Sequence, residues 1–323
     1  ANSSQLDVSV VICTRNRAAP LAELLESFTR IRVPDGLAWE LLIVDNGSTD
    51  ATPQVIEGFA DRLPVRAVRE ETPGLANARN RGVAGARGRY ICWTDDDVEV
   101  DPDWLAAYAD AFRRFPDAAV FGGEIIPKLQ PPTPRWFARL CHRWPLDNIV
   151  AARSFGEAIE LDFERGVVPW GANYAMRTEE QRRHLYDPNL GVSPVQRRSG
   201  EETQAIFEAV RAGAKGRWAP ASKVYHLFPP HRQTRRYFHQ HFVGIGETQA
   251  YLDATHEIHY MNRDGRQPRD VRRSAGDLWL RMIFYGALFT GFHAIGMTQR
   301  SLYYLRRHSI YSGVLAFKRR AQA

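Results

Sequence analysis

Two hydrophobic periodicities alternate along the first part of this 323-residue chain, and this alternation constrains the fold more than any other feature. Continuous apolar runs rich in β-branched residues, such as VSVVICT at 8–14, are typical of strands buried on both faces. Between these runs, apolar residues recur at helical spacing, as Leu21, Leu24 and Phe28 do. The strand-like runs lie at 8–14, 39–45, 65–70, 90–96 and 118–125, and the helical segments lie at 21–31, 48–62, 74–88 and 101–115. The sequence therefore predicts an α/β domain with a mostly parallel, doubly wound sheet covered on both faces.

In such a sheet, the ligand site lies beyond the carboxyl ends of the strands. The polar residues that follow those ends are Thr14, Arg15, Arg17, Asp45, Asn46, Asp95, Asp96 and Asp97. We therefore expect their side chains to converge on one edge of the sheet. A dinucleotide site would need G-x-G-x-x-G after the first strand, but the loop there, CTRNRAAP, contains no glycine. The sequence does not favour a dinucleotide-binding domain.

Composition and cysteine content narrow the class of protein. With 44% hydrophobic and 25% charged residues, the chain is neither disordered nor fibrous, and its length suits one sizeable core with an elaborated C-terminal part. The three cysteines are widely spaced, so we expect neither a disulfide framework nor a zinc site. The first residues, ANSSQLD, do not resemble a signal peptide, so we expect a cytoplasmic protein.

Five segments, in this order and spacing, carry a resemblance to a known family. They are VVICTRNR, LLIVDNGSTDAT, PGLANARNRGVAGARGRYICWTDDDVEVDPDWL, WGANYAMR and GEETQ, and they span roughly 6–230. The chain resembles a family 2 glycosyltransferase of the GT-A fold, of the inverting type found in bacterial polysaccharide and glycolipid synthesis. We accordingly expect a nucleotide-sugar-binding half at 1–127, an acceptor-binding and catalytic half of the same domain at 128–262, and a basic, amphipathic C-terminal extension at 263–323.

Three consecutive aspartates, Asp95, Asp96 and Asp97, follow an apolar strand, and because like charges repel, a cation is their obvious partner. A hard divalent cation bound by one or two carboxylates stabilises the charge that develops on a nucleoside diphosphate leaving group. Asp95 and Asp97 are spaced as in the family's D-x-D motif and point the same way along an extended segment. By resemblance, Asp97 binds Mg²⁺ or Mn²⁺, and Asp95 contacts the ribose or the metal. Alternatively, the three carboxylates only keep a surface loop in contact with water, or they cap the helix expected from Asp101.

Two histidines near the last strand-like segment are further candidates. His226 and His231 lie in YHLFPPHR, directly after SKVY. The position of His226 resembles one where some GT-A enzymes add an imidazole metal ligand, and His231 is the weaker candidate. A lone histidine is more often structural, so that alternative stays open.

The predicted nucleotide site uses residues that follow the first two strands. Asp45 ends a buried strand and precedes the turn-forming NGSTD. In the resembling family this aspartate accepts a hydrogen bond from a uracil or thymine imide, although it could instead bond its own turn. Arg79, in ARNRG, matches a family arginine that faces the nucleotide, with an exposed helix arginine as the alternative. The predicted nucleotide-sugar site comprises Thr14, Arg15, Arg17, Asp45, Arg79, Asp95 and Asp96.

An inverting transfer also needs a base that takes the proton from the acceptor hydroxyl. The stretch SGEETQAIFEAV places Glu201 and Glu202 at a helix start, where the helix dipole favours ionised carboxylates. The family pattern there is usually G-E-D with the aspartate as base, so the resemblance makes Glu202 the general base, one methylene longer than usual. Glu201 and Trp170, in PWGANYAMR, are the predicted acceptor-binding residues. The alternative for Glu202 is a plain helix-start acid, and the alternative for Trp170 is a core tryptophan.

The C-terminal part needs a separate explanation. From Arg263 onward the chain carries twelve basic and three acidic residues, and 278–297 is apolar except for Arg281 and His293. Three interpretations stay open: a helix lying in a membrane interface, a packing contact, or a true membrane span. No recognised nucleic-acid motif accompanies the basic residues, so anionic lipid headgroups or a lipid-diphosphate acceptor are the better partner for 278–323.

The leading hypothesis is a metal-dependent inverting glycosyltransferase that moves a sugar from a UDP- or TDP-sugar to a saccharide or lipid-linked acceptor. We expect it in the cytoplasm, at the inner face of the plasma membrane, as a peripheral protein that could form a homo-oligomer. A nucleotidyltransferase is the alternative enzyme, although it would ordinarily have a glycine-rich first loop. A catalytically inactive sugar-nucleotide-binding module is the alternative from another class.

Overall fold

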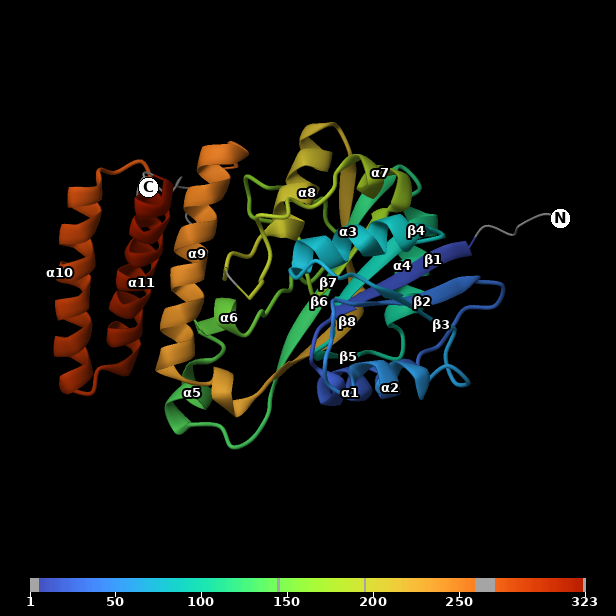
Figure 1. The fold of residues 1–323 in the computed structure, drawn as a ribbon, viewed down its shortest axis with the longest axis horizontal. Helices are drawn as coiled ribbons and strands as arrows, with labels where there is room; N and C mark the ends of the chain where they lie inside the picture. Colours follow the sequence, from blue (N-terminus) through green and yellow to red (C-terminus); the bar gives the residue numbers. More distant parts are fainter. Residues whose placement is uncertain (1–5, 144–145, 195, 259–270, 322–323) are drawn as a thin grey trace.

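The computed structural model describes residues 6–143, 146–194, 196–258 and 271–321. They form one eight-stranded sheet with helices on both faces and a further group of long helices beyond one end of it (Figure 1). The strands are β1 Leu6–Thr14, β2 Trp39–Asp45, β3 Val65–Arg69, β4 Gly88–Asp95, β5 Val98–Val100, β6 Ala118–Leu129, β7 Asn173–Arg177 and β8 Lys215–Phe228. Their order across the sheet is β3-β2-β1-β4-β7-β6-β8-β5.

The first four strands in the sheet order, β3 to β4, run parallel, as the alternating periodicity predicts. Their register places Thr14 beside Asp45 and Cys13 beside Asp95, so their carboxyl ends meet at one edge. Beyond β4 the sheet is mixed. There β7 lies antiparallel between β4 and β6, β6 pairs parallel with β8, and β5 pairs antiparallel with β8.

Helices cover both faces of the sheet because strand side chains alternate between the faces. Val10 and Ile12 of β1 pack in one apolar cluster with α1 Ala18–Phe28, α2 Thr52–Glu57 and α4 Trp104–Arg114. Val11 belongs to the opposite cluster, with α3 Leu75–Gly85 and α8 Glu201–Arg211. A short helix, α7 Thr178–Arg183, lies beside α3 and α8. The predicted α/β class with two covered faces is confirmed.

Several element boundaries differ from the sequence prediction, as in α1, which spans Ala18–Phe28 rather than 21–31. Helix α2 spans six residues rather than 48–62, and the chain after it continues in turns in which Phe59 N–H donates to Ile56 O and Ala60 N–H donates to Glu57 O. The three-residue strand β5 was not predicted, since so short a segment carries no periodicity. Strand β6 continues to Leu129 rather than ending at 125. The reason is that β8, which has 14 residues, pairs with β6 as far as Leu129.

The helices beyond the sheet form a separate apolar cluster. They are α5 Arg135–Leu140, α6 Leu146–Ile149, α9 Arg235–Thr255, α10 Ala275–Ala294 and α11 Thr298–Ala321. Helix α11 packs against both α9 and α10, and α10 is the outermost of the three (Figure 1). The boundary predicted at 263 lies outside the described residues, and α9 before it shares one core with α11 after it. Within the described ranges, no helix is long and apolar enough to cross a bilayer.

Candidate active site

The aspartate triplet lies where β4 turns into β5. Asp95 is the last residue of β4, and the backbone oxygen of Asp97 accepts a hydrogen bond from Leu227 of β8 at 2.9 Å. The antiparallel pairing of β5 with β8 sets Val98 opposite His226 and so brings His226 beside the triplet. Asp96 and Asp97 are 7% and 9% exposed, and α4 begins only at Trp104. The alternative that the triplet solvates a loop or caps that helix therefore does not fit.

Asp97 is surrounded by positively charged groups. Its Oδ2 lies 2.9 Å from Arg17 Nη2 and 2.8 Å from Arg232 Nη1, and its Oδ1 lies 3.5 Å from His226 Nε2. Burial alone would raise the pKa of Asp97, but His226, Arg232 and Arg17 together hold it well below its usual range. Asp97 is consequently ionised at neutral pH, and the same attraction raises the pKa of His226 against the effect of its burial.

Asp96 faces the loop after β1. The hydroxyl of Thr14 donates a hydrogen bond to its Oδ2 at 2.7 Å, and Arg17 Nε lies 2.7 Å from its Oδ1. Burial raises the pKa of Asp96 to about 7, with Arg17 opposing the shift and Asp97 adding to it. Thr14, Arg17 and the aspartates therefore do converge, as the carboxyl ends of β1 and β4 predict.

Arg79 lies beneath the triplet and is only 2% exposed. Its guanidinium stacks on Trp93, Tyr174 and Tyr186, with 5.2, 5.8 and 5.8 Å to the ring centroids. Its Nη2 lies 3.3 Å from Asp95 Oδ1 and donates to the backbone oxygen of Gly171 at 3.4 Å. The alternative of an exposed helix arginine is wrong, and contact with a nucleotide stays a prediction.

The two glutamates at the start of α8 have different surroundings. Glu201 is 3% exposed, and its Oε1 lies 3.3 Å from Arg79 Nε, so it faces this arginine rather than open space. Glu202 is half-buried, and its Oε1 accepts a hydrogen bond from the backbone N–H of Gly171 at 3.3 Å. Burial raises the pKa of both carboxyls, that of Glu201 to about 8 with the charge of Glu202 adding to the shift.

Trp170 stands next to Gly171 in the loop before β7. It is half-buried, packs against the apolar cluster on the α1 face of the sheet, and carries the guanidinium of Arg153 4.6 Å from its ring centroid. The side chain of Trp170 is therefore packed against the core on one part and exposed on another. Its proposed contact with an acceptor stays a prediction, and it adjoins the predicted base through Gly171.

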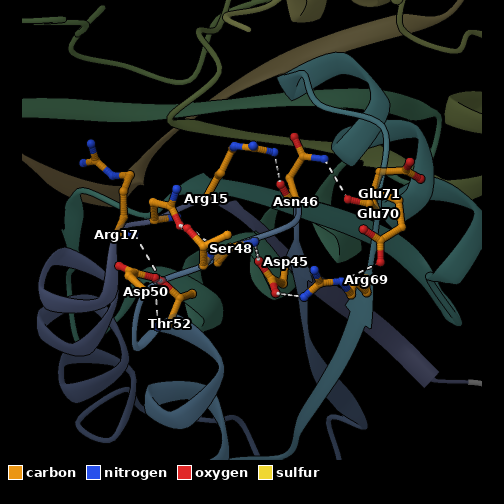
Figure 2. Close-up of polar contacts among 12 residues, drawn as sticks. Arg15, Arg17, Asp45, Asn46, Ser48, Asp50, Thr52, Arg69, Glu70 and Glu71 are labelled. Carbon is orange, nitrogen blue, oxygen red and sulfur yellow. Dashed lines mark hydrogen bonds and ion pairs between the residues drawn. The ribbon is translucent and has the colours of Figure 1, made fainter. Parts of the chain in front are cut away.

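A second group of polar contacts joins the loops after β1, β2 and β3 (Figure 2). Asp45 Oδ1 accepts a hydrogen bond from the backbone N–H of Ser48 at 2.8 Å, which is the turn contact considered as the alternative. Its Oδ2 lies 3.3 Å from Arg69 Nη1, at the end of β3. Arg15 donates to the backbone oxygen of Asn46 at 2.5 Å and so braces the same loop. Binding of a base by Asp45 stays a prediction.

The sequence analysis missed two residues near the site, Arg232 and Arg69. Arg232, from the short 3-10 helix Pro230–Arg232, pairs with Asp97, whereas His231 beside it is exposed. Arg69 pairs with Asp45, and the side chain of Asn46 links the β2 and β3 loops by donating to the backbone oxygens of Glu70 and Thr72. Because β2 and β3 are neighbouring strands, the end of β3 lies beside Asp45, and this adjacency could have indicated Arg69 from the sequence.

Asp97 and the side chains near it include kinds that commonly bind divalent cations. Carboxylates and a neutral imidazole are common ligands, and the Nδ1 of His226 is buried without a hydrogen-bond partner. Across the residues that the structure describes, however, no three His, Cys, Asp or Glu side chains stand together as a ready ligand set. Arg17 and Arg232 face the carboxylate of Asp97 instead. The metal ligands Asp97, Asp95 and His226 therefore stay a prediction.

Comparison with known proteins places part of the chain beside a known family. Residues 9–153 match the family model for glycosyl transferase family 2. The glucosyl-dolichyl phosphate glucuronosyltransferase of Haloferax volcanii is 29% identical over 162 residues, which cover 48% of this chain and 49% of that protein. The succinoglycan biosynthesis protein ExoM of Rhizobium meliloti is 28% identical over 133 residues, which cover 41% of this chain and 42% of that protein. The chain thus spans about half or less of the length of these relatives.

Solved structures share the architecture over nearly the whole chain. S. aureus TarS 1-349 is similar with a TM-score of 0.56 at 16% identity, covering 98% of this chain and 92% of that one. The mannosyltransferase PcManGT of Pyrobaculum calidifontis, solved with GDP-Man and Mn²⁺, is similar with a TM-score of 0.54 at 17% identity, covering 99% of this chain and 77% of that one. At such low identity these structures establish the fold alone. Residues 9–153 therefore resemble glycosyl transferase family 2, and the chain has the GT-A fold.

Proposed function

We propose that this chain is a metal-dependent inverting glycosyltransferase that moves a sugar from a UDP- or TDP-sugar to a saccharide or lipid-linked acceptor. One observation carries the proposal. The buried guanidinium of Arg79 contacts Asp95 and Gly171 through Nη2 and Glu201 through Nε, all within 3.4 Å. It thereby joins the predicted donor carboxylates to the segment that holds the predicted base, Glu202.

The donor half of the site binds and orients a nucleoside diphosphate. Arg17 and Arg232 both approach Asp97, and their guanidinium groups are suited to paired contacts with phosphate oxygens. Asp97 and His226, with Asp95, would hold a divalent cation, which when bound supplies Lewis-acid stabilisation of the leaving diphosphate. Thr14 holds Asp96 at the same edge through its hydroxyl.

The base half of the site is built around Glu202. Its carboxylate takes the proton from an acceptor hydroxyl as that oxygen attacks the anomeric carbon of the donor sugar. The N–H of Gly171 fixes the orientation of this carboxylate, and half-burial keeps its pKa above the usual value, which strengthens it as a base once ionised. Glu201, turned toward Arg79, acts as a positioning residue for the start of α8.

The names of the relatives support the acceptor class. The Haloferax protein is named for a dolichyl phosphate-linked substrate and ExoM for polysaccharide biosynthesis, so a lipid-linked or saccharide acceptor is proposed here too. With such an acceptor, the cytoplasmic face of the plasma membrane is the proposed place of action. Asp45 is the proposed hydrogen-bond partner of the nucleobase of the donor.

The test is a product analysis of the full chain with a panel of UDP-, TDP- and GDP-sugars, each with and without Mn²⁺. A glycosyltransferase releases a nucleoside diphosphate, with transfer to added saccharide or by slow hydrolysis. When pyrophosphate is added, a nucleotidyltransferase instead converts the nucleotide sugar and pyrophosphate into a nucleoside triphosphate and a sugar 1-phosphate. An inactive binding module is stabilised thermally by a nucleotide sugar without forming either set of products. Formation of a nucleoside triphosphate from a nucleotide sugar and added pyrophosphate, or stabilisation without turnover, would overturn the proposal.

A further inference from the structure

Helix α9 contacts the segment that leads into the proposed base. The backbone N–H of Ser199 donates a hydrogen bond to Thr248 Oγ1 of α9 at 2.9 Å. Ser199 is followed by Gly200 and then by Glu201 and Glu202, the first two residues of α8. Thr248 therefore holds the backbone directly before the two glutamates, although it belongs to a different helix.

The hydroxyl of Thr248 is held in one orientation. Thr248 is 1% exposed, and its hydroxyl donates a hydrogen bond to the backbone oxygen of Gly244, one turn earlier in α9, at 2.9 Å. Because the hydroxyl proton is used in this bond, the oxygen serves Ser199 as an acceptor. Serine can make both bonds, whereas valine has the branched shape of threonine but neither a donor nor an acceptor.

Two further contacts lie on the same side of α9. Arg197 Nη1 donates a hydrogen bond to Gln240 Oε1 at 3.0 Å. The backbone of Arg197 also approaches Gly244 so closely that a Cβ atom added to this glycine would lie 2.7 Å from the Arg197 backbone oxygen. Gln240, Gly244 and Thr248 are spaced by four residues, so they form one row along the helix. This row, which we call the α9 support, carries residues 197–199.

Helix α11 fixes α9 from another side. A Cβ atom added to Gly246 would lie 2.2 Å from the backbone oxygen of Ile310, and one added to Gly313 would lie 2.0 Å from that of Val243. The two helix backbones are therefore in direct contact at this point. Both helices also contribute buried side chains to the apolar cluster beyond the sheet. The α9 support is consequently part of a packed group of helices.

We propose that Thr248 is a positioning residue for Glu202, and that the α9 support holds the start of α8 at a fixed distance from Asp97. At the other end of this span, Arg232 shortly precedes α9 and lies 2.8 Å from Asp97 Oδ2. Proton transfer from an acceptor hydroxyl needs the base and the donor sugar in a set geometry, and a misplacement of ~1 Å costs about 10²-fold in rate. This role rests on the proposed function, in which Glu202 is the base.

The first experiment removes the hydrogen bond and then restores it. Thr248→Val should lower kcat about tenfold with little change in the KM for the donor, because the base moves and the donor site does not. Thr248→Ser should keep kcat within about twofold of the native value, since serine can accept from Ser199. Thr255→Val is the matched control, because the exposed Thr255 donates in the same way to the backbone oxygen of Tyr251, at 2.7 Å.

Hydrogen exchange reports the bond to Ser199 without any substrate. The Ser199 amide should exchange at least about fivefold faster in Thr248→Val than in the native chain, because it loses its acceptor. It should exchange at the native rate in Thr248→Ser. Circular dichroism establishes that each variant is folded.

A second variant crowds the same contact. Gly244→Ala places a methyl group against the Arg197 backbone oxygen, so it should displace 197–199 and lower kcat about tenfold, even though alanine favours a helix. Gly291→Ala, in α10, is the control, since a Cβ atom there meets nothing within 4 Å. It should leave kcat unchanged. If Thr248→Val does not fold, Gly244→Ala decides.

Native kcat in a folded Thr248→Val variant, or in Gly244→Ala, would overturn the role of Thr248 and leave the proposed function intact. An equal loss in Thr248→Val and Thr248→Ser would also overturn it, because the hydrogen bond would then not be what matters. A native chain that transfers no sugar would overturn the proposed function itself, and the role of Thr248 with it.

Discussion

The Nε of Arg79 and the Oε1 of Glu201 lie 3.3 Å apart, and both side chains are almost completely buried. Asp95 and Glu202 lie near the same guanidinium, so three carboxyl groups share one buried positive charge. Burial disfavours ionisation of all three at once, and it raises the pKa of Glu201 to about 8, so Glu201 retains its proton near neutral pH. Several consequences of this arrangement can be measured.

Arg79→Lys should keep the charge but lose the planar fork that reaches Asp95, Gly171 and Glu201 together. We expect kcat to fall about 10²-fold or more with a small change in the KM for the donor, because misplacement of the base affects the chemical step. Arg81→Lys, at an exposed position of the same helix, is the control. Equal kcat values for the two variants would contradict the positioning role.

Glu202→Gln should lower kcat by ~10²-fold or more while the donor still binds, since a general base contributes on that order. Glu201→Gln should have a milder effect, because Glu201 already holds its proton near neutral pH. Single-turnover kinetics with donor titration separates the chemical step from binding. A larger loss in Glu201→Gln than in Glu202→Gln would mean that the base is the other glutamate.

The pH dependence of kcat should report the ionisation of Glu202. Because burial raises the pKa of Glu202 against the opposing charge of Arg79, activity should appear on raising the pH above the usual range for a glutamate. The Glu201→Gln variant should keep the same acid limb, because Glu201 is neutral throughout that range in the native chain. A clear shift of the acid limb in this variant would show that the two carboxyls titrate in the opposite order.

Stability should also depend on pH through Glu201. Its pKa is raised from 4.5 to about 8 in the folded chain, so the folded state binds the proton more tightly than the unfolded state. This contribution is fully present below about pH 4.5 and is lost as the pH rises through about 8. Thermal unfolding between pH 6 and pH 9 should therefore show a decline in Tm that is smaller in Glu201→Gln. Parallel curves for the two proteins would contradict the assignment.

Asp97→Asn should weaken the Mn²⁺-dependent stabilisation of the chain by UDP and remove most of the activity. The carboxylate is ionised and is the shared partner of Arg17, Arg232 and His226, so its removal also leaves these groups without a negative partner. Thermal shift with UDP, Mn²⁺ and both together is the measurement. Asp110→Asn, on the exposed side of α4, is the control. Unchanged turnover in Asp97→Asn would exclude it from the site.

The sequence analysis predicted the parallel half of the sheet because each strand there is an apolar run with its own crossover helix. It singled out Asp97 and Glu202 as candidates from short motifs, since D-x-D and G-E-E keep their residues close along the chain. The burial of Arg79 could not be predicted in this way. Its ring partners Trp93, Tyr174 and Tyr186 come from separate parts of the chain and meet only because β7 inserts beside β4.

Arg232 illustrates the same limit at shorter range. The sequence analysis considered the histidines of YHLFPPHR, whose ring nitrogens made them candidate ligands, and passed over the arginine beside them. The approach of Arg232 to Asp97 depends on the length of β8 and on the 3-10 turn Pro230–Arg232 that follows it. Neither the end of β8 nor the existence of β5, against which it pairs, is encoded in a local pattern.

Arg232 stands shortly before α9 and pairs with Asp97. Helix α9 in turn shares one apolar core with α10 and α11. The C-terminal helices therefore give distant support to one of the two arginines that face Asp97, so the packing of these helices and the geometry of the aspartate triplet are tied together.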